Sequence, residues 1–214
     1  AAATGNVLLF IDADVVVAPD AIARTVRILQ ERPEVTALVG TFDEDTPVPG
    51  FPSDYKNLYV CHGWGLMPPY IGATNTSITA VRRAAFDEAG GFDAKVPTSE
   101  DDRFGAELVA RGATIWLDQG VRIQHLKRYT MATLLRDSYV KSKYLACSYV
   151  WHWLDPDRRN GRFGHHSPVL MASLVAAYLV LVAGLMAVLW PERATLSVAA
   201  LTLGLYALLH ARTW

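Results

Sequence analysis

The stretch GNVLLFIDADVVVAPD, residues 5–20, decides the fold class of this chain. Its apolar run, Val7–Ile11, is typical of a strand that is buried on both faces of a sheet. Asp12 and Asp14 follow this run directly. Because residues two apart in an extended chain point to the same side, the two carboxylates are expected to converge at the carboxyl end of the strand, where open α/β sheets place their ligands.

Strands and helices alternate downstream of this stretch, which predicts an α/β fold with a mostly parallel sheet. Further strands are predicted over residues 35–41, 72–80 and 113–117, and helices over residues 20–32, 81–89 and 101–111. In the first helix, Ile22, Val26 and Leu29 are expected to face the core. Residues 42–69, rich in Pro, Gly and Asp, are expected to form a long functional loop with one helix near residues 55–60.

The composition favours a globular part joined to a membrane part, because 51% of the residues are hydrophobic and the mean hydropathy is slightly positive. The net charge is −1. A net charge near zero gives no reason to expect nucleic acid as a partner. The uncharged run 168–190, as a helix that rises about 1.5 Å per residue, is long enough to cross a hydrocarbon core of about 30 Å. Together with residues 194–210 it predicts a transmembrane hairpin within a membrane region of residues 167–214.

The segment before that hairpin, residues 131–166, is basic and is expected to lie next to the membrane. Arg158, Arg159 and Arg162 belong to it, so the positive-inside rule places the N-terminal domain on the cytoplasmic side of a plasma or inner membrane. The chain opens with Ala1, only a few residues before a core strand. We therefore expect a fragment that lacks its N-terminal part.

The two aspartates after the first strand indicate a divalent cation. Unpaired carboxylates beside a buried strand end would repel each other and be costly to desolvate. Mn²⁺ or Mg²⁺ would relieve this cost, and such ions usually keep positions open for phosphate oxygens. In the alternative interpretation, Asp14 merely begins a loop and Asp12 is the partner in a salt bridge.

Two families place this spacing after an apolar strand. Haloacid-dehalogenase-like phosphatases resemble the chain at IDADVV, with Asp12 as nucleophile, and at Leu38–Thr41, which is similar to their second motif. They also need a lysine and then an acidic pair after another apolar strand. Here the pair Asp101-Asp102 follows a polar run, and no lysine stands out between.

The second family accounts for more of the chain. LLFIDADVVVAPDAI resembles the D-x-D strand and following helix of the family 2 glycosyltransferases, which have the GT-A fold. GATNTSITAVRRAAFDEAGGFD, residues 72–93, is similar to their acceptor-side block, and TSEDDRFGAELVARGATIWL to their Glu-Asp helix and the strand after it. His125 falls where several members place a histidine near the metal. The resemblance implies that residues 1–130 are the C-terminal part of a GT-A catalytic domain.

This resemblance also implies an inverting transfer from a UDP- or GDP-linked sugar. Asp14, with Asp12 and His125, would hold Mn²⁺ or Mg²⁺ at the diphosphate, and Asp101 would be the general base, with Glu100 and Asp102 as alternatives. Without the family, a histidine at a strand end is equally a structural residue, and acids at a helix start are favoured by the helix dipole alone.

The remaining site predictions concern phosphate and acceptor. Lys127, Arg128 and Lys141 are candidate contacts to the diphosphate or to anionic lipid, although a solvated, membrane-facing basic surface explains them as well. Trp64 and Tyr70 are candidates to stack on a sugar or to contact a lipid, or else pack internally. Gly72 and Asn75 belong to the block that resembles the acceptor side.

The function expected from the sequence is therefore transfer of a sugar to a membrane-associated acceptor, either a lipid or a glycan. The region 136–144 lacks the Gln-x-x-Arg-Trp motif of processive members, which favours a non-processive enzyme. The phosphatase remains the enzymatic alternative. A membrane-anchored remnant that binds a partner without catalysis is the non-enzymatic alternative.

Overall fold

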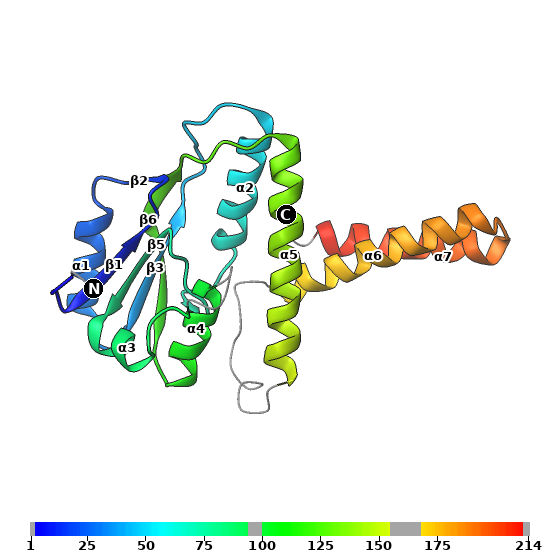
Figure 1. Cartoon of the computed structure of the whole chain (residues 1–214). Coiled ribbons are helices and arrows are strands. Elements are labelled where there is room, and N and C mark those ends of the chain that lie inside the picture. The colour runs from blue at the N-terminus through cyan, green and yellow to red at the C-terminus, as the bar shows by residue number, and fades with distance from the viewer. Residues whose placement is uncertain (1–2, 94–99, 155–167, 212–214) are drawn as a thin grey trace. The chain divides into compact units, whose positions relative to one another are not determined.

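The computed structural model describes residues 3–93, 100–154 and 168–211. The chain divides into two compact units, residues 1–165 and 166–214. The first unit holds a sheet with helices packed against it, and the second consists of helices (Figure 1). All the predicted site residues lie in the first unit.

One mixed sheet forms the centre of the first unit, with the strand order β1-β5-β3-β6-β2 and with β4 paired to β6. Its strands are β1 (Val7–Ile11), β2 (Val15–Val17), β3 (Ala37–Phe42), β4 (Tyr70–Ile71), β5 (Ile78–Arg82) and β6 (Ile115–His125). The described residues contain one parallel pairing, between β3 and β6, and the other pairings are antiparallel. The prediction of a mostly parallel sheet is therefore wrong.

Strand direction nevertheless brings the predicted site to one edge of the sheet. β1 and β3 are both antiparallel to β5, and β3 is parallel to β6, so β1, β3 and β6 all run the same way. Asp12 follows β1, and His125 ends β6. The start of β5 reaches the same edge, because Ile78 pairs with Ile11. We call this the acidic edge of the sheet.

The sequence predicts the position of β1 correctly but not its burial. β1 lies at the end of the sheet order, so it has a single neighbour, and Leu8 is its one buried residue while Val7 and Ile11 are exposed. The sequence does not predict the strand β2, because Val15–Val17 is only three residues long and directly follows the turn that contains Asp14. It pairs with the end of β6, with Val15 opposite His125.

The helices of the first unit cover both faces of the sheet, with α1 on one side and α2 and α4 on the other (Figure 1). They are α1 (Ala21–Glu31), α2 (Phe51–Gly65), α3 (Arg83–Glu88), α4 (Glu100–Ala110) and α5 (Met131–Leu154). α1 buries Ala21, Thr25, Ile28 and Leu29. The predicted inner residues Ile22 and Val26 are instead about half exposed, so that part of the prediction is wrong.

α2 replaces most of the long loop predicted over residues 42–69. It runs over a full 15 residues, Phe51–Gly65, rather than the short stretch expected near residues 55–60. Pro52 stands in its first turn, where a missing N–H costs nothing. Near its carboxyl end Trp64 is buried in the core with 4% of its surface exposed, and this burial holds the helix to the sheet.

The second unit contains α6 (Pro168–Leu189) and α7 (Arg193–Ala211), which pack against each other. Ala176, Ala183 and Ala187 are buried along one face of α6, whereas most of the larger apolar side chains of both helices are exposed. The bounds of these two helices agree closely with the predicted ranges, residues 168–190 and 194–210. Among the described residues, however, no helix meets the length and apolarity needed to cross a membrane, so the transmembrane prediction is not supported.

Candidate functional site

Asp12 is fixed at the acidic edge by a serine from the neighbouring strand. Ser77 Oγ donates a hydrogen bond of 2.7 Å to Asp12 Oδ2. Ser77 has 7% of its surface exposed, and its backbone N–H donates in turn to Oδ1 of Asn75 at 3.0 Å. No residue that the structure describes bonds the other carboxylate oxygen of Asp12, so the carboxylate is oriented while one oxygen remains available to a ligand.

Asp14 lies in the turn between β1 and β2 and faces His125 from there. Its Oδ1 is 3.9 Å from Nε2 of His125, and its backbone oxygen accepts the N–H of Leu126 at 2.8 Å. The side chain of Asp14 is 51% exposed. Residues 13–14 form a turn, so the side-chain alternation of an extended chain does not apply to them, but both aspartates act on the pKa of His125.

His125 is held between charges of opposite sign. Burial lowers the pKa of its imidazole, and Asp14 and Asp12 raise it. Lys127 and Lys141 lower it again. The backbone N–H of Lys127 donates to Nδ1 at 3.0 Å, so the neutral ring carries its proton on Nε2, the nitrogen that faces Asp14. His125 could bind a metal on that side only if this hydrogen bond broke or the proton left.

These residues fit a hard divalent cation that is bound in part by its substrate. The described residues contain no group of three or more acidic, histidine or cysteine side chains placed to enclose an ion. Mg²⁺ and Mn²⁺ do not need such a group, since one or two carboxylates with water and phosphate oxygens suffice. Asp12 and Asp14 offer that set, and Asp12 is already oriented by Ser77.

Asp101 stands at the start of α4, beside the same segment that holds Asp12. Thr74 Oγ1 donates to the backbone oxygen of Asp101 at 2.6 Å, and the backbone N–H of Thr76 bonds to its carboxylate. The backbone N–H of Asp102 donates to Asp101 Oδ1 at 2.9 Å. The segment 73–77, which we call the bridging segment, therefore contacts both Asp12 and Asp101.

The pKa of Asp101 is suited to proton transfer near neutral pH. Burial and the nearby charge of Asp102 raise the pKa of this carboxyl to about 6, against the lowering effect of its bonds to the N–H groups of Asp102 and Thr76. A carboxylate with such a pKa is mostly ionised at pH 7 and still basic enough to accept a proton.

A glycine sets the distance between α4 and the bridging segment. A Cβ built on Gly105 would lie 2.5 Å from the backbone nitrogen of Thr74 and 2.6 Å from Ala73 Cα. These are backbone atoms, which cannot turn aside as a flexible side chain can. Gly105 therefore allows the helix to approach closely enough for Thr74 to reach Asp101.

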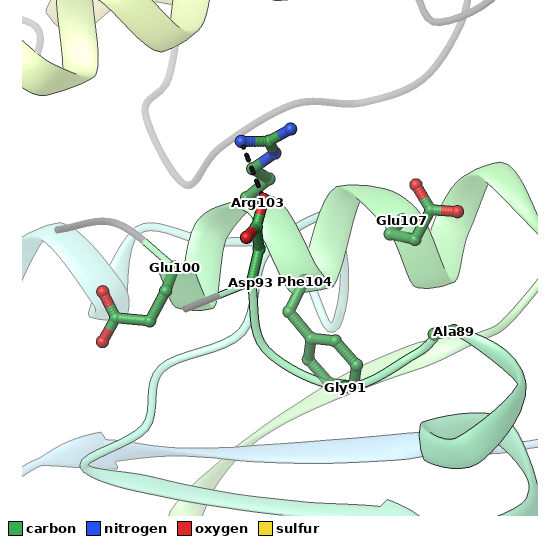
Figure 2. A pocket seen from close by; sticks show the side chains of 7 residues that line it. All are labelled: Ala89, Gly91, Asp93, Glu100, Arg103, Phe104 and Glu107. Carbon is green, nitrogen blue, oxygen red and sulfur yellow. Dashed lines mark ion pairs between the residues drawn. The ribbon is translucent and has the colours of Figure 1, made fainter. Parts of the chain in front are cut away.

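The other two acids of α4 have different surroundings. Asp102 is buried, with 6% of its surface exposed. Glu100 lines a pocket of about 150 Å³ between α4 and the turn after α3 (Figure 2). In this pocket Arg103 and Asp93 form an ion pair of 3.4 Å, and the ring of Phe104 points towards Gly91 (Figure 2). Of the three predicted candidates, Asp101 is the one that Thr74 and Thr76 bind from the bridging segment.

The predicted acceptor residues fall into two groups. Gly72 and Asn75 lie in or beside the buried bridging segment, close to Ser77. Trp64 is buried in the core, where its ring has no open face to offer an acceptor. Tyr70 pairs with Trp116 near the start of β6, far along that strand from His125.

Asn75 carries a buried donor without a described partner. Its Oδ1 accepts a hydrogen bond from the backbone N–H of Ser77, but Nδ2 has no hydrogen-bond partner among the described residues. Such a group costs free energy unless a ligand or water satisfies it. In the chain Asn75 stands between Thr74, which bonds Asp101, and Ser77, which bonds Asp12.

Sequence reasoning names Lys127 and Lys141 as candidate phosphate contacts but misses Lys56 and Asp137, which join them in a positively charged group beside this edge. Lys56, Lys127 and Lys141 surround Asp137, which draws together α2, the connection after β6, and α5. Arg128, the predicted phosphate contact, is exposed in that connection. Lys56 is far in the sequence from Lys127 and Lys141, so no local motif predicts that the three lysines lie together.

Comparison with known proteins identifies the chain's family. The family model described as Glycosyl transferase family 21 matches residues 1–139. Among solved structures, the chain is similar to the mannosyltransferase PcManGT from Pyrobaculum calidifontis, solved in complex with GDP-Man and Mn²⁺. The identity is 18%, the TM-score is 0.48, and the match covers 98% of this chain and 62% of that one. No curated protein matches at a significant level.

The family match confirms the resemblance to glycosyltransferases of the GT-A type, although the matching family is 21 rather than 2. It favours a glycosyltransferase over the phosphatase that the two aspartates alone also allow. The chain belongs to glycosyl transferase family 21.

Proposed function

We propose that this chain transfers a sugar, with inversion at the anomeric carbon, from a UDP- or GDP-linked donor to a lipid or glycan acceptor. The observation that carries the proposal is the bridging segment, which bonds Asp12 through Ser77 and Asp101 through Thr74 and Thr76. It holds a candidate metal ligand and a candidate base at one edge of the sheet.

Asp101 acts as the general base in this proposal. An acceptor hydroxyl attacks the anomeric carbon, its oxygen forms the new glycosidic bond, and its proton passes to the Asp101 carboxylate. The bond from the anomeric carbon to the diphosphate oxygen breaks, and the nucleoside diphosphate leaves with its electron pair. The pKa of about 6 leaves Asp101 ionised and ready for this step at pH 7.

In this proposal Asp12 and Asp14 bind the metal ion that accompanies the leaving nucleoside diphosphate. When bound there, Mn²⁺ or Mg²⁺ would supply positive charge to the diphosphate. Ser77 keeps Asp12 oriented whether or not the ion is present. Asn75 is suited to donate its unpartnered N–H to a hydroxyl of the sugar or the acceptor.

The proposal also includes a single transfer per binding event and an acceptor at the cytoplasmic face of the cell membrane. The absence of a Gln-x-x-Arg-Trp motif at residues 136–144 supports the first. Exposed apolar side chains on α6 and α7, among them Val188 at 78% and Leu201 at 74%, support an acceptor held in lipid.

The test uses the full chain with Mn²⁺, labelled UDP- and GDP-sugars, and lipid and glycan fractions as acceptors. We expect transfer from one donor, and a loss of about 100-fold or more in Asp101→Asn. Asp87→Asn, an exposed acid on α3, is the matched control and should keep full activity. A folded chain that transfers nothing from any donor would be a non-catalytic remnant and would overturn the proposal.

A further inference from the structure

Three lysines converge on one carboxylate beside the acidic edge. Asp137 lies 3.6 Å from Lys56 Nζ, 3.5 Å from Lys127 Nζ and 3.8 Å from Lys141 Nζ. Three positive charges face one negative charge, so the group carries a surplus of positive charge. We call these residues the lysine cluster.

Asp137 does not satisfy the ammonium groups around it. All three distances exceed the roughly 2.7–2.9 Å of a tight hydrogen bond between an ammonium and a carboxylate. Asp137 Oδ2 is buried without a hydrogen-bond partner among the described residues. Each ammonium carries three N–H donors, so most donors of the cluster remain free of this carboxylate. The cluster thus resembles a site that is incomplete without a further anion.

Burial makes the surplus charge costly. The side chain of Lys56 is 14% exposed and that of Asp137 is 17% exposed. Burial, together with the charge of Lys141, lowers the pKa of the Lys56 ammonium. Although burial acts the other way, Lys141, Lys127 and Lys56 hold the pKa of Asp137 below its ordinary value. A bound anion would relieve the repulsion among the lysines.

The cluster lies next to the candidate metal ligands. Lys127 donates its backbone N–H to His125, on whose far side stands Asp14. Burial raises the pKa of the Tyr129 hydroxyl, and the charges of Asp137 and Asp14 both raise it further, so charges from both groups act on this side chain. The site therefore has a negative part, suited to a cation, and a positive part, suited to the phosphate that accompanies such a cation.

We propose that Lys56, Lys127 and Lys141 form a binding site for a phosphate group, with Asp137 holding the three lysines together in its absence. Two sources of that phosphate are considered, the donor's diphosphate and a phosphorylated lipid acceptor, and both rest on the proposed function. The inference that the lysine cluster binds a phosphate group does not depend on the proposed function.

The first experiment measures pyrophosphate binding to the full chain by calorimetry, at low salt and without divalent metal. Lys127→Ala and Lys141→Ala are exposed enough to fold, and each should weaken binding about tenfold. Lys143→Ala, an exposed lysine of the same helix α5, is the matched control and should bind as wild type. Asp137→Asn should bind at least as tightly as wild type, because it removes the competing anion.

A second pair of measurements identifies the source. If the double variant of Lys127 and Lys141 loses affinity for GDP or UDP, the cluster holds the donor's diphosphate. If it keeps that affinity and loses binding to vesicles containing phosphatidic acid, the cluster holds a lipid phosphate. Pyrophosphate binding that is equal in wild type, both lysine variants and the control would overturn the inference, even in a chain that transfers sugar. Lysine-dependent binding in a chain without transfer would sustain the inference and defeat the proposed function alone.

Discussion

Ser77 and Asp12, far apart in the sequence, are joined by a hydrogen bond of 2.7 Å from Ser77 Oγ to Asp12 Oδ2 at the acidic edge of the sheet. The bond follows from the pairing of β1 with β5, which sets Ile11 opposite Ile78 and so places the residues that flank them side by side. This hydrogen bond orients the Asp12 carboxylate, which the proposal assigns to the metal ion.

Ser77→Ala should weaken the binding of the divalent metal ion measurably. Without the hydrogen bond, Asp12 is free to turn, and loss of such a supporting bond typically costs about tenfold or more in metal affinity. The concentration of Mn²⁺ that gives half-maximal sugar transfer should therefore rise about tenfold. Ser138→Ala, at an exposed position of α5, should leave it unchanged. An unchanged Mn²⁺ dependence in Ser77→Ala would show that Asp12 does not bind the ion.

The rate of transfer should follow the ionisation of Asp101. A general base works in its deprotonated form, so kcat/KM should rise with pH through about 6 and level off above pH 7. The measurement is a pH profile of kcat/KM with the preferred donor. A profile that is flat between pH 5 and pH 7 would assign the base to another residue.

Asp101→Asn should also stabilise the fold while it abolishes transfer. The folded-state pKa of about 6 lies above the ordinary value of 3.8, so wild-type stability falls as pH rises from about 4 to about 6. Above pH 6 the variant, which has no charge to bury, should be more stable by an amount on the order of 1 kcal/mol. Urea denaturation at pH 4 and pH 7 tests this, since the difference should vanish at pH 4.

Gly105→Ala should lower both stability and activity. The added methyl would meet backbone atoms of Ala73 and Thr74 at 2.5–2.6 Å, so α4 must move away from the bridging segment and carry Asp101 with it. Overpacking of this kind costs about 1–3 kcal/mol. Gly63→Ala in α2, whose Cβ would meet nothing within 4 Å, should instead stabilise the chain by up to about 1 kcal/mol. Thermal unfolding and transfer assays on both variants make the comparison.

Asp118→Asn should loosen α1 from the sheet. Arg24 binds both oxygens of Asp118, at 2.6 and 3.2 Å, and the N–H groups of Gly120 and Val121 donate to Oδ1. The amide would lose the charge-assisted part of these bonds, for a cost of about 2 kcal/mol in the free energy of unfolding. Glu107→Gln, which breaks the more exposed pair with Arg111, should cost less than about 0.5 kcal/mol.

The free energy of unfolding at acid pH should depend on the ion pair between Arg24 and Asp118. Burial raises the pKa of Asp118, but the bonds from Arg24 and Gly120 outweigh it and hold the pKa below the ordinary value of 3.8. A depressed pKa contributes stability above the ordinary value, and this contribution is lost as pH falls through the folded-state pKa. Asp118→Asn should therefore be less stable than wild type at pH 6, with the gap closing as pH falls below about 4.

The sequence predicts β1, α4 and the two acidic motifs well, because each depends on a local pattern. It fails for the inner face of α1, where the contacts are made by Ala21 and Thr25, residues that a hydrophobic pattern gives little weight. It fails for α2 because Pro52, Gly63 and Gly65 are typical of loops, while burial of Trp64 keeps the helix folded.

The residues of the candidate site also fall into those that a local sequence pattern predicts and those that only tertiary packing brings together. Asp12, Asp14 and Asp101 are recognisable from short motifs and from a family resemblance. Their connection through Ser77 is not, since it depends on how β1 and β5 pair. Asp137 and the lysines around it come from α2, α5 and the connection between β6 and α5, and only tertiary packing brings these together.

The bridging segment has a consequence for motion. Ala73, Thr74 and Ser77 are buried, and the segment is bonded on one side to a strand end and on the other to a helix start. Its amide protons should exchange slowly with solvent, as those of a core strand do. If Asp12 binds the metal and Asp101 is the base, as proposed, the spacing between them is then a fixed dimension, and the movements that admit and release substrates take place in other parts of the chain.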